Sequence, residues 1–307
     1  MFHMPGESYR GTPPPLGAAQ TALRDRLRAH VRELAQRIGE RHYWRPGNLR
    51  DAATYIEQTF RNAGHAPVKH AVSIQSEVFE SIEVRLPGTS PDNESLVIGA
   101  HYDTIRGTPG ADDNASGVAV LLELSRLLRV ANFNRTIRLV AFANEEAPFF
   151  GSEAMGSLSY ARQARANGDN IVGMISLEML GYYTDAPDSQ RHPPLLGYFY
   201  PHTGNFVAFV GNTASRQLVR QAIGTFREYA ALPSEGLAAP ELIGDIRRSD
   251  HWAFWRMGYP AMMLTDTANF RNPNYHGPHD TYETLDYDTM ARLTAALART
   301  VEDMARQ

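Results

Sequence analysis

Apolar residues recur at helical spacing in the first part of the chain. Steps of four and three residues separate them, which predicts an amphipathic helix. A second run with the same period covers residues 48–63, and Gly64 follows it as a left-handed cap. The apolar positions of the first helix are Leu23, Leu27, Val31, Leu34 and Ile38.

From residue 95 onward, short apolar runs alternate with segments of helical period. The alternation is typical of a largely parallel sheet with helices on both faces. We therefore predict an α/β fold of three layers, with a mixed, mostly parallel central sheet. Strands are predicted at 95–100, 136–143, 171–177, 206–210 and 261–265. Helices are predicted at 116–130, 213–229, 249–258 and 290–304.

The chain shows no internal repeat and no linker rich in Gly, Ser or charge. We therefore expect a single domain over residues 1–307, with a Pro-rich, extended lead-in at 1–17. Three irregular stretches, at 181–205, 231–248 and 268–285, are longer than ordinary connections. We expect them to build the rim of a binding site.

Composition narrows the range of functions. The 307 residues are 43% hydrophobic and 21% charged, as in a soluble globular protein, and the net charge of −4 predicts no binding to nucleic acid. No cysteine occurs, so any metal must be held by His and carboxylates. No run of about 18 apolar residues is present to span a membrane. The start of the chain lacks a signal peptide, which predicts a cytoplasmic protein if it is full length and an exported one if a leader was removed.

Acidic residues and histidines follow the predicted strands at the points where the strands end. His101 comes directly after the strand at 95–100, the pair Glu145–Glu146 after the strand at 136–143, and Glu178 after the strand at 171–177. Ligands bind at this edge of an open α/β sheet, so these side chains are expected to converge. Three further residues in nearby loops complete the candidate set, namely Asp103, Asp113 and His276.

Imidazole nitrogens and carboxylate oxygens suit zinc, and one carboxylate that bridges two zinc ions makes a co-catalytic site. In the pair Glu145–Glu146, one carboxylate then binds metal while its neighbour is a general base. Each element also has an ordinary structural explanation, such as a loop hydrogen bond, a solvated surface or a helix cap. Glu178 fits these least well, because a carboxylate at the end of an apolar run is costly to bury without a partner.

Several motifs together resemble the zinc-dependent exopeptidase family of the bacterial leucyl aminopeptidases, whose relatives include glutamate carboxypeptidases and glutaminyl cyclases. The resemblance extends from about residue 95 to 285, and its most specific part is the string Gly-Ala-Asp-Asp-Asn-Ala-Ser-Gly at 110–117. The other matching strings are His-Tyr-Asp at 101–103, Asn-Glu-Glu at 144–146, Ser-Leu-Glu-Met at 176–179, Ser-Asp-His at 249–251, Tyr-His at 275–276 and Asp-Thr at 280–281.

The resemblance implies a role for each matching residue. Asp113 would bridge two zinc ions, and the peptide bond between Asp113 and Asn114 would be cis. Glu145 would be the general base, Asp103 would orient an imidazole, and Tyr275 would bond the developing oxyanion. The position of Glu178 is more often Asp in well-known members. The metal ligands implied are His101, Asp113, Glu146, Glu178 and His276.

The activity implied is that of a di-zinc aminopeptidase acting on peptides with a free N-terminus. A metal-bound hydroxide would attack the N-terminal peptide bond, with Glu145 as base. Three alternatives remain open: a glutaminyl cyclase that uses one zinc, a carboxypeptidase, and a non-catalytic binding module that keeps the fold.

Overall fold

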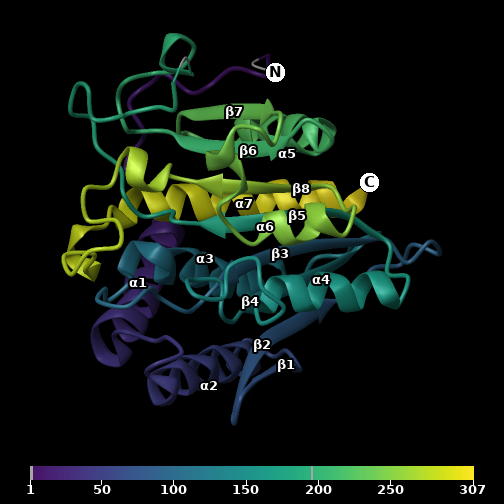
Figure 1. The fold of residues 1–307 in the computed structure, drawn as a ribbon. Coiled ribbons are helices and arrows are strands. Elements are labelled where there is room, and N and C mark those ends of the chain that lie inside the picture. Colours follow the sequence, from purple (N-terminus) through teal and green to yellow (C-terminus); the bar gives the residue numbers. More distant parts are fainter. Residues whose placement is uncertain (1–2, 195) are drawn as a thin grey trace.

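The structure, a computed structural model, describes residues 3–194 and 196–307. Residues 1–2 of the predicted lead-in and residue 195 of the stretch 181–205 lie outside it. The described strands form one eight-stranded sheet in the order β1-β2-β4-β3-β5-β8-β6-β7 (Figure 1). Their bounds are β1 Val68–Ile74, β2 Glu77–Leu86, β3 Ser95–His101, β4 Thr136–Phe142, β5 Ile171–Glu178, β6 Val207–Asn212, β7 Ser234–Ala239 and β8 Ala261–Thr265.

The centre of the sheet is parallel, and its flanks contain antiparallel pairs. Strands β4, β3, β5 and β8 pair in parallel, and β6 pairs in parallel with β7. The pairs β1–β2, β2–β4 and β6–β8 are antiparallel. The predicted mixed, mostly parallel sheet is therefore confirmed.

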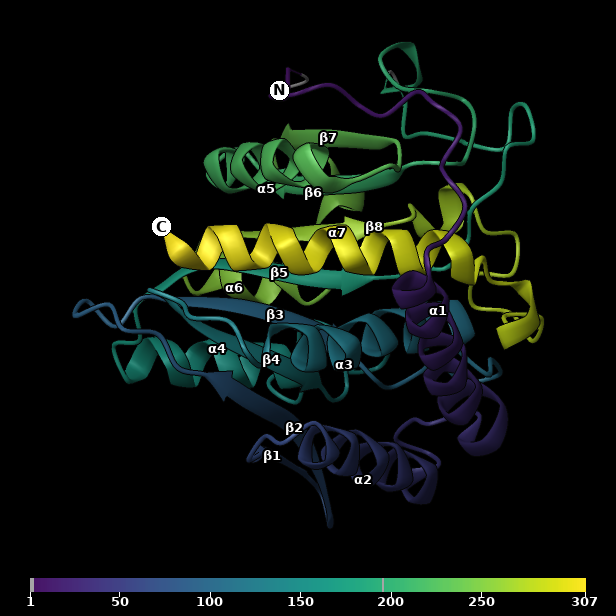
Figure 2. The same ribbon diagram turned by 180° about the vertical axis from the view of Figure 1, so that it is seen from behind.

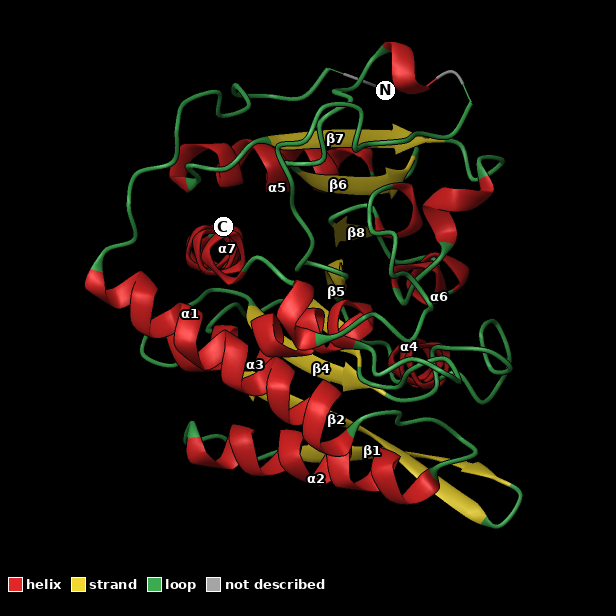
Figure 3. Ribbon diagram, turned by 90° about the vertical axis from the view of Figure 1, so that its left-hand side faces the viewer, coloured by secondary structure: helices red, strands yellow, loops and turns green. Residues whose placement is uncertain are grey.

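Helices cover both faces of this sheet (Figures 2 and 3). Figure 3 shows α1, α2, α3, α5 and α7 on one side and α4 with α6 on the other, which gives the predicted three layers. The helices are α1 Ala18–Val31, α2 Pro46–Asn62, α3 Gly117–Leu128, α4 Gly156–Ala166, α5 Arg216–Tyr229, α6 His251–Arg256 and α7 Tyr287–Arg306. Wider turns follow α1 at Arg32–Ile38 and precede α3 at Ala111–Ser116, and short 3₁₀ turns lie at Leu196–Tyr198, Gly244–Arg247, Ala268–Phe270 and Tyr282–Thr284. None of the described helices is both long and apolar enough to cross a bilayer.

Burial explains why these segments take these forms. Every residue of β3 is buried, as expected for a central strand covered on both faces. In α7, the buried residues Met290, Leu293, Leu297 and Val301 follow the three-to-four spacing, and the side chain of Asp286 caps the helix by accepting from the N–H of Thr289.

Three strands and one helix were not predicted from the sequence. The hairpin of β1 and β2 precedes the first predicted strand, and α4 fills part of the connection from β4 to β5. Strand β7 lies within 231–248, so the expectation that this stretch is irregular was wrong. Both β1 and β7 are edge strands, and the residues of β7 (SEGLAA) are weak strand formers.

Candidate metal centre

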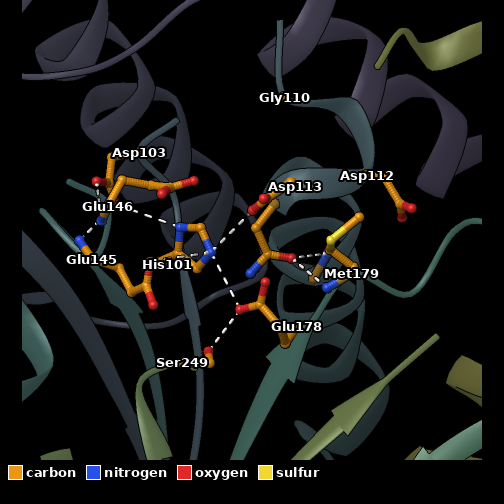
Figure 4. Close-up of polar contacts among 12 residues, drawn as sticks. His101, Asp103, Gly110, Asp112, Asp113, Glu145, Glu146, Glu178, Met179 and Ser249 are labelled. Carbon is orange, nitrogen blue, oxygen red and sulfur yellow. Dashed lines mark hydrogen bonds and ion pairs between the residues drawn. The ribbon is translucent and has the colours of Figure 1, made fainter. Parts of the chain in front are cut away.

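Three neighbouring strands bring acidic and imidazole side chains to one edge of the sheet. His101 is the last residue of β3, and Glu178 is the last residue of β5. Glu145 and Glu146 follow the end of β4, which pairs in parallel with β3 so that His101 lies opposite Phe142. Figure 4 shows His101 and Glu178 pointing toward each other. The convergence expected from the strand ends is therefore what the structure shows.

Asp113 comes from the loop between β3 and α3, where the backbone is tightly held. The peptide bond between Asp113 and Asn114 is cis, as the resemblance implied. The carboxylate of Asp280 accepts from the N–H groups of Asp112 at 2.9 Å and of Asp113 at 3.1 Å. Gly110 has a φ of 65°, and a Cβ there would lie 2.5 Å from the carbonyl oxygen of Asp113, so only glycine fits. The side chain of Asp113 is thereby directed into the site.

Asn114 connects this loop to the end of β5. Its Nδ2 donates to the carbonyl oxygen of Leu177 at 2.8 Å, and its Oδ1 accepts from the N–H of Met179 at 3.1 Å. These two partners flank Glu178 in the chain. The side chain of Asn114 thus fixes the position of Glu178 relative to Asp113.

Two groups of candidate ligands share the carboxylate of Asp113. In the first group, Nε2 of His101 lies 3.3 Å from Asp113 Oδ1 and 3.3 Å from Glu178 Oε2. In the second, Nε2 of His276 lies 3.1 Å from Asp113 Oδ2 and 3.5 Å from Glu146 Oε1. Within each group, all three ligand atoms lie within 4.8 Å of one another. His101 is buried, whereas the side chain of His276 is 29% exposed, so the centre opens to solvent on the His276 side.

Asp103 holds several parts of the centre in place. Its Oδ1 lies 3.5 Å from Nδ1 of His101, in the position expected for a residue that orients the imidazole. Its two oxygens also accept from the N–H groups of Glu145 and Glu146, both at 3.0 Å. Asp103 therefore positions the acidic pair as well as His101, a second role that the sequence did not indicate.

Glu145 is buried but belongs to neither ligand group. Its Oε2 lies 4.0 Å from Nε2 of His101. Burial raises its pKa well above the ordinary value, the imidazole of His101 opposes this, and the carboxylates of Glu146 and Glu178 add to it. The side chain is thus next to the ligands without being one of them.

The site concentrates more negative charge than its two imidazoles balance. Burial and the adjacent Asp113 raise the pKa of Glu146 to about 7. Asp113 Oδ1 and Glu146 Oε1 are buried, and neither has a hydrogen-bond partner within the described part of the chain. Buried carboxylates in this state need compensation, and divalent cations supply it. The nitrogen and oxygen donors present are those that zinc accepts, so the residues fit that metal.

Two supporting residues were not recognised from the sequence. Ser249 was placed at the start of a helix and in a matching string but was given no role, and its hydroxyl donates to Glu178 Oε2 at 2.6 Å and lies 2.9 Å from the hydroxyl of Ser176. Asp280, which holds the Asp113 loop, was given no role. Its place four residues after His276 was the available signal.

Tyr275 lies at the exposed side of the centre. Its ring stacks on the imidazole of His276, with a centroid distance of 3.7 Å. Its hydroxyl accepts from Nη2 of Arg248 at 3.2 Å, and the guanidinium of Arg248 also lies 3.6 Å from the carboxylate of Asp245. The structure therefore places Tyr275 beside the ligands, as the sequence suggested.

Comparison with known proteins identifies the family. A profile of peptidase family M28 matches residues 81–301, which is more than half of the chain. The chain belongs to peptidase family M28.

Two relatives and one solved structure illustrate the similarity of this M28 peptidase to known proteins. Uncharacterized protein YfbL of Escherichia coli (strain K12) is 39% identical over 278 residues, 88% of this chain and 84% of that protein. Probable leucine aminopeptidase of Arthroderma otae (strain ATCC MYA-4605 / CBS 113480) is 27% identical over 256 residues, 78% of this chain and 62% of that protein. The structure of BSAP, a zinc aminopeptidase from Bacillus subtilis, matches with a TM-score of 0.74 at 13% identity, over 92% of this chain and 95% of that chain. These similarities confirm the predicted resemblance, fold and enzyme class, a metallo-exopeptidase.

A pocket adjoins the metal centre of this M28 peptidase. It encloses about 860 Å³, its solvent-filled mouth included, and Glu178 and Tyr275 belong to its lining. The size suits one amino-acid side chain or a somewhat larger group. Parts of all three long stretches contribute residues to the lining, namely 190–193, 196, 200, 235–237, 245–246, 248, 268–270 and 275.

Proposed function

We propose that this chain is a zinc-dependent aminopeptidase that holds two zinc ions and releases the N-terminal residue of peptides. The observation that carries the proposal is the pair of ligand groups that share Asp113. Membership of peptidase family M28 supports it. So do the printed names of the Arthroderma otae relative, a leucine aminopeptidase, and of the Bacillus subtilis structure, a zinc aminopeptidase.

In this proposal His101, Asp113 and Glu178 hold one ion, and Asp113, Glu146 and His276 hold the other. Zinc supplies a Lewis acid that polarises a carbonyl oxygen and lowers the pKa of water. The chain's own residues then control position and protons. The ligands are fixed before a substrate arrives, because Asp103, Ser249 and Asp280 hold them or their backbone through hydrogen bonds.

Glu145 would act as the general base. It removes a proton from the attacking water and returns it to the leaving amine. Its carboxylate is buried beside His101 and belongs to neither ligand group, so it remains available for this proton transfer. Tyr275 would donate to the oxyanion, because its hydroxyl accepts from Arg248 and keeps its own proton for donation.

Hydrolysis of aminoacyl p-nitroanilides tests the proposal. We expect activity that a chelator abolishes and added zinc restores, with two zinc ions bound per chain. The Glu145→Gln variant should keep both ions and lose about 10²- to 10⁴-fold in kcat. The matched control is Glu228→Gln, which removes an exposed carboxylate of α5.

Three outcomes would contradict the proposal or its parts. A nearly active Glu145→Gln variant would refute the assignment of the base. Cleavage of peptides with a blocked N-terminus would indicate a carboxypeptidase. One bound zinc ion, with no release of aniline from any aminoacyl substrate, would favour the cyclase.

A further inference from the structure

A row of paired residues crosses the sheet from the metal centre to strand β7. Glu178 of β5 pairs with Thr265 of β8, Thr265 pairs with Ala208 of β6, and Ala208 pairs with Glu235 of β7. Residues that lie directly opposite each other in a sheet point to the same face. Glu235 therefore projects from the same face as the candidate ligand Glu178, three strand spacings or about 14 Å away.

The pocket beside the metal centre extends over this row. Its lining includes both Glu178 and Glu235, as well as the two residues between them, Ala208 and Thr265. Both intermediate side chains are small, so they leave open space above the sheet. Apolar side chains form much of the surrounding wall, namely Leu196, Phe206, Val210, Leu237, Met263 and Phe270.

The basic side chains around the pocket all have other partners. Each of the three that line the pocket makes a hydrogen bond or an ion pair away from Glu235, so none of the three forms an ion pair with that carboxylate. Arg191 donates to the carbonyl oxygen of Asn269 at 2.9 Å, and the ring of His192 bonds the carbonyl oxygen of Pro201 at 2.9 Å. Arg248 lies 3.6 Å from the carboxylate of Asp245.

Glu235 itself is half-buried and has no side-chain hydrogen bond or ion pair with any residue that the structure describes. The guanidinium of Arg227 binds Ser234 instead, at its carbonyl oxygen and its hydroxyl. Burial raises the pKa of Glu235, and the positive charges of Arg227 and Arg10 only partly oppose this. A carboxylate in such surroundings is stabilised by any cation that enters the pocket.

We infer that this pocket receives the side chain of the substrate's N-terminal residue and that Glu235 selects a basic side chain, Lys or Arg. The inference rests on the proposed function, because it assumes that the peptide bond is held at the metal centre. The methylene groups of a long basic side chain would lie along the apolar wall while its charged end pairs with Glu235. A Leu side chain ends short of Glu235 and leaves that carboxylate without a partner.

The test compares substrates that differ only at the end of the side chain. We would measure kcat/KM of the zinc-loaded full chain for p-nitroanilides of Lys, Arg, Leu and norleucine. Norleucine keeps the lysine stem and lacks the ammonium group. The variant Glu235→Gln keeps the shape of the side chain and removes its charge, and Glu228→Gln removes a charge outside the pocket.

We expect the wild-type protein to prefer Lys and Arg over norleucine. Glu235→Gln should lower the Lys-to-norleucine ratio of kcat/KM at least about tenfold, with activity on norleucine retained, and Glu228→Gln should leave the ratio unchanged. A ratio that Glu235→Gln leaves unchanged, or a wild-type protein that cleaves norleucine and Leu as well as Lys, would overturn the inference while the proposed function stands. No hydrolysis of any of the four substrates by the zinc-loaded protein would overturn the proposed function and this inference with it.

Discussion

The hydrogen bond from Ser249 to Glu178 allows a sharp test of how the metal centre is built. The hydroxyl of Ser249 is fully buried, donates to Glu178 Oε2 at 2.6 Å, and is itself contacted by the hydroxyl of Ser176 at 2.9 Å. Ser249→Ala removes the donor and leaves the hydroxyl of Ser176 without that partner. A hydrogen bond to a charged group contributes about 1.5–3 kcal/mol.

Loss of this hydrogen bond should weaken metal binding, because the bond holds the Glu178 carboxylate in the orientation in which its Oε2 lies 3.3 Å from Nε2 of His101. At about 1.4 kcal/mol for each factor of ten, a loss of 1.5–3 kcal/mol corresponds to about 10- to 100-fold weaker binding at that one position. The second position, with Glu146 and His276, does not contain Glu178 and should change much less.

The assay is zinc competition with a chelator of known affinity, combined with kcat/KM for an aminoacyl p-nitroanilide. If the chain holds two zinc ions as proposed, we expect Ser249→Ala to lose one of them at chelator concentrations that the wild type withstands. Ser125→Ala is the matched control, since its buried hydroxyl donates to the carbonyl oxygen of Leu122 within α3, away from the site. Wild-type affinity for both ions in Ser249→Ala would refute the reasoning, and so would an equal loss in Ser125→Ala.

Two further predictions concern stability. Arg41 is fully buried and donates to five backbone carbonyls of the described chain, among them those of Pro109 and Gly110 at 2.8 Å. Lysine has only three donors, so Arg41→Lys should leave at least two of these carbonyls unpaired, lower the free energy of unfolding by about 4 kcal/mol and lower Tm by about 10 °C. An unchanged Tm in a thermal scan would contradict this. Burial lowers the pKa of His251 to about 4, although its ring bonds the carbonyl oxygen of Ile246, so the unfolded chain takes up a proton between pH 6.5 and 4 that the folded protein does not. The free energy of unfolding should therefore fall by about 3 kcal/mol through this group as the pH drops over that window. In His251→Gln the other titrating groups are unchanged, so urea titrations should show a free energy of unfolding that falls with pH by that much less. If the free energy of unfolding fell equally with pH in both proteins, a neutral buried His251 would be excluded.

Three of the candidate ligands, His101, Glu146 and Glu178, were identifiable from sequence because a topological rule places them, whereas Asp113 and His276 lie in loops and were indicated by the family resemblance. Parallel strands end at one edge of the sheet, so acids and histidines that directly follow apolar runs are brought together whatever the loops between them do. His101 and Glu178 are the last residues of adjacent strands, and the rule applies to them in its simplest form. The roles of Asp280 and Ser249 were beyond this rule, since they depend on which backbone or side-chain atoms lie within hydrogen-bond distance.

Two of the strands missed in the sequence, β1 and β7, lie at the edges of the sheet and are stabilised more by their place there than by their own residue pattern. Strand β1 lies at the edge of the sheet and is mostly exposed, so its apolar residues do not form the run that marks β3. Strand β7 consists of small residues, one glutamate and one leucine, and its pairing with β6 makes it a strand. Local propensity is weak in β7, and β1 has Val and Ile but little burial, so tertiary contacts determine the outcome in both.

The pocket beside the metal centre could not be predicted from the sequence either, and this affects the proposed preference for a substrate side chain. Glu235 lies in a stretch that looks irregular in sequence, 57 residues beyond Glu178, and nothing in either segment connects the two. The connection arises only from register: β5 with β8, β8 with β6, and β6 with β7. A shift of one residue in β7 would turn Glu235 to the opposite face, where α5 packs, and place a different side chain in the pocket. In the proposed mode of substrate selection, substrate choice therefore depends on strand pairing at the edge of the sheet, whereas the proposed chemistry depends on where the central strands end.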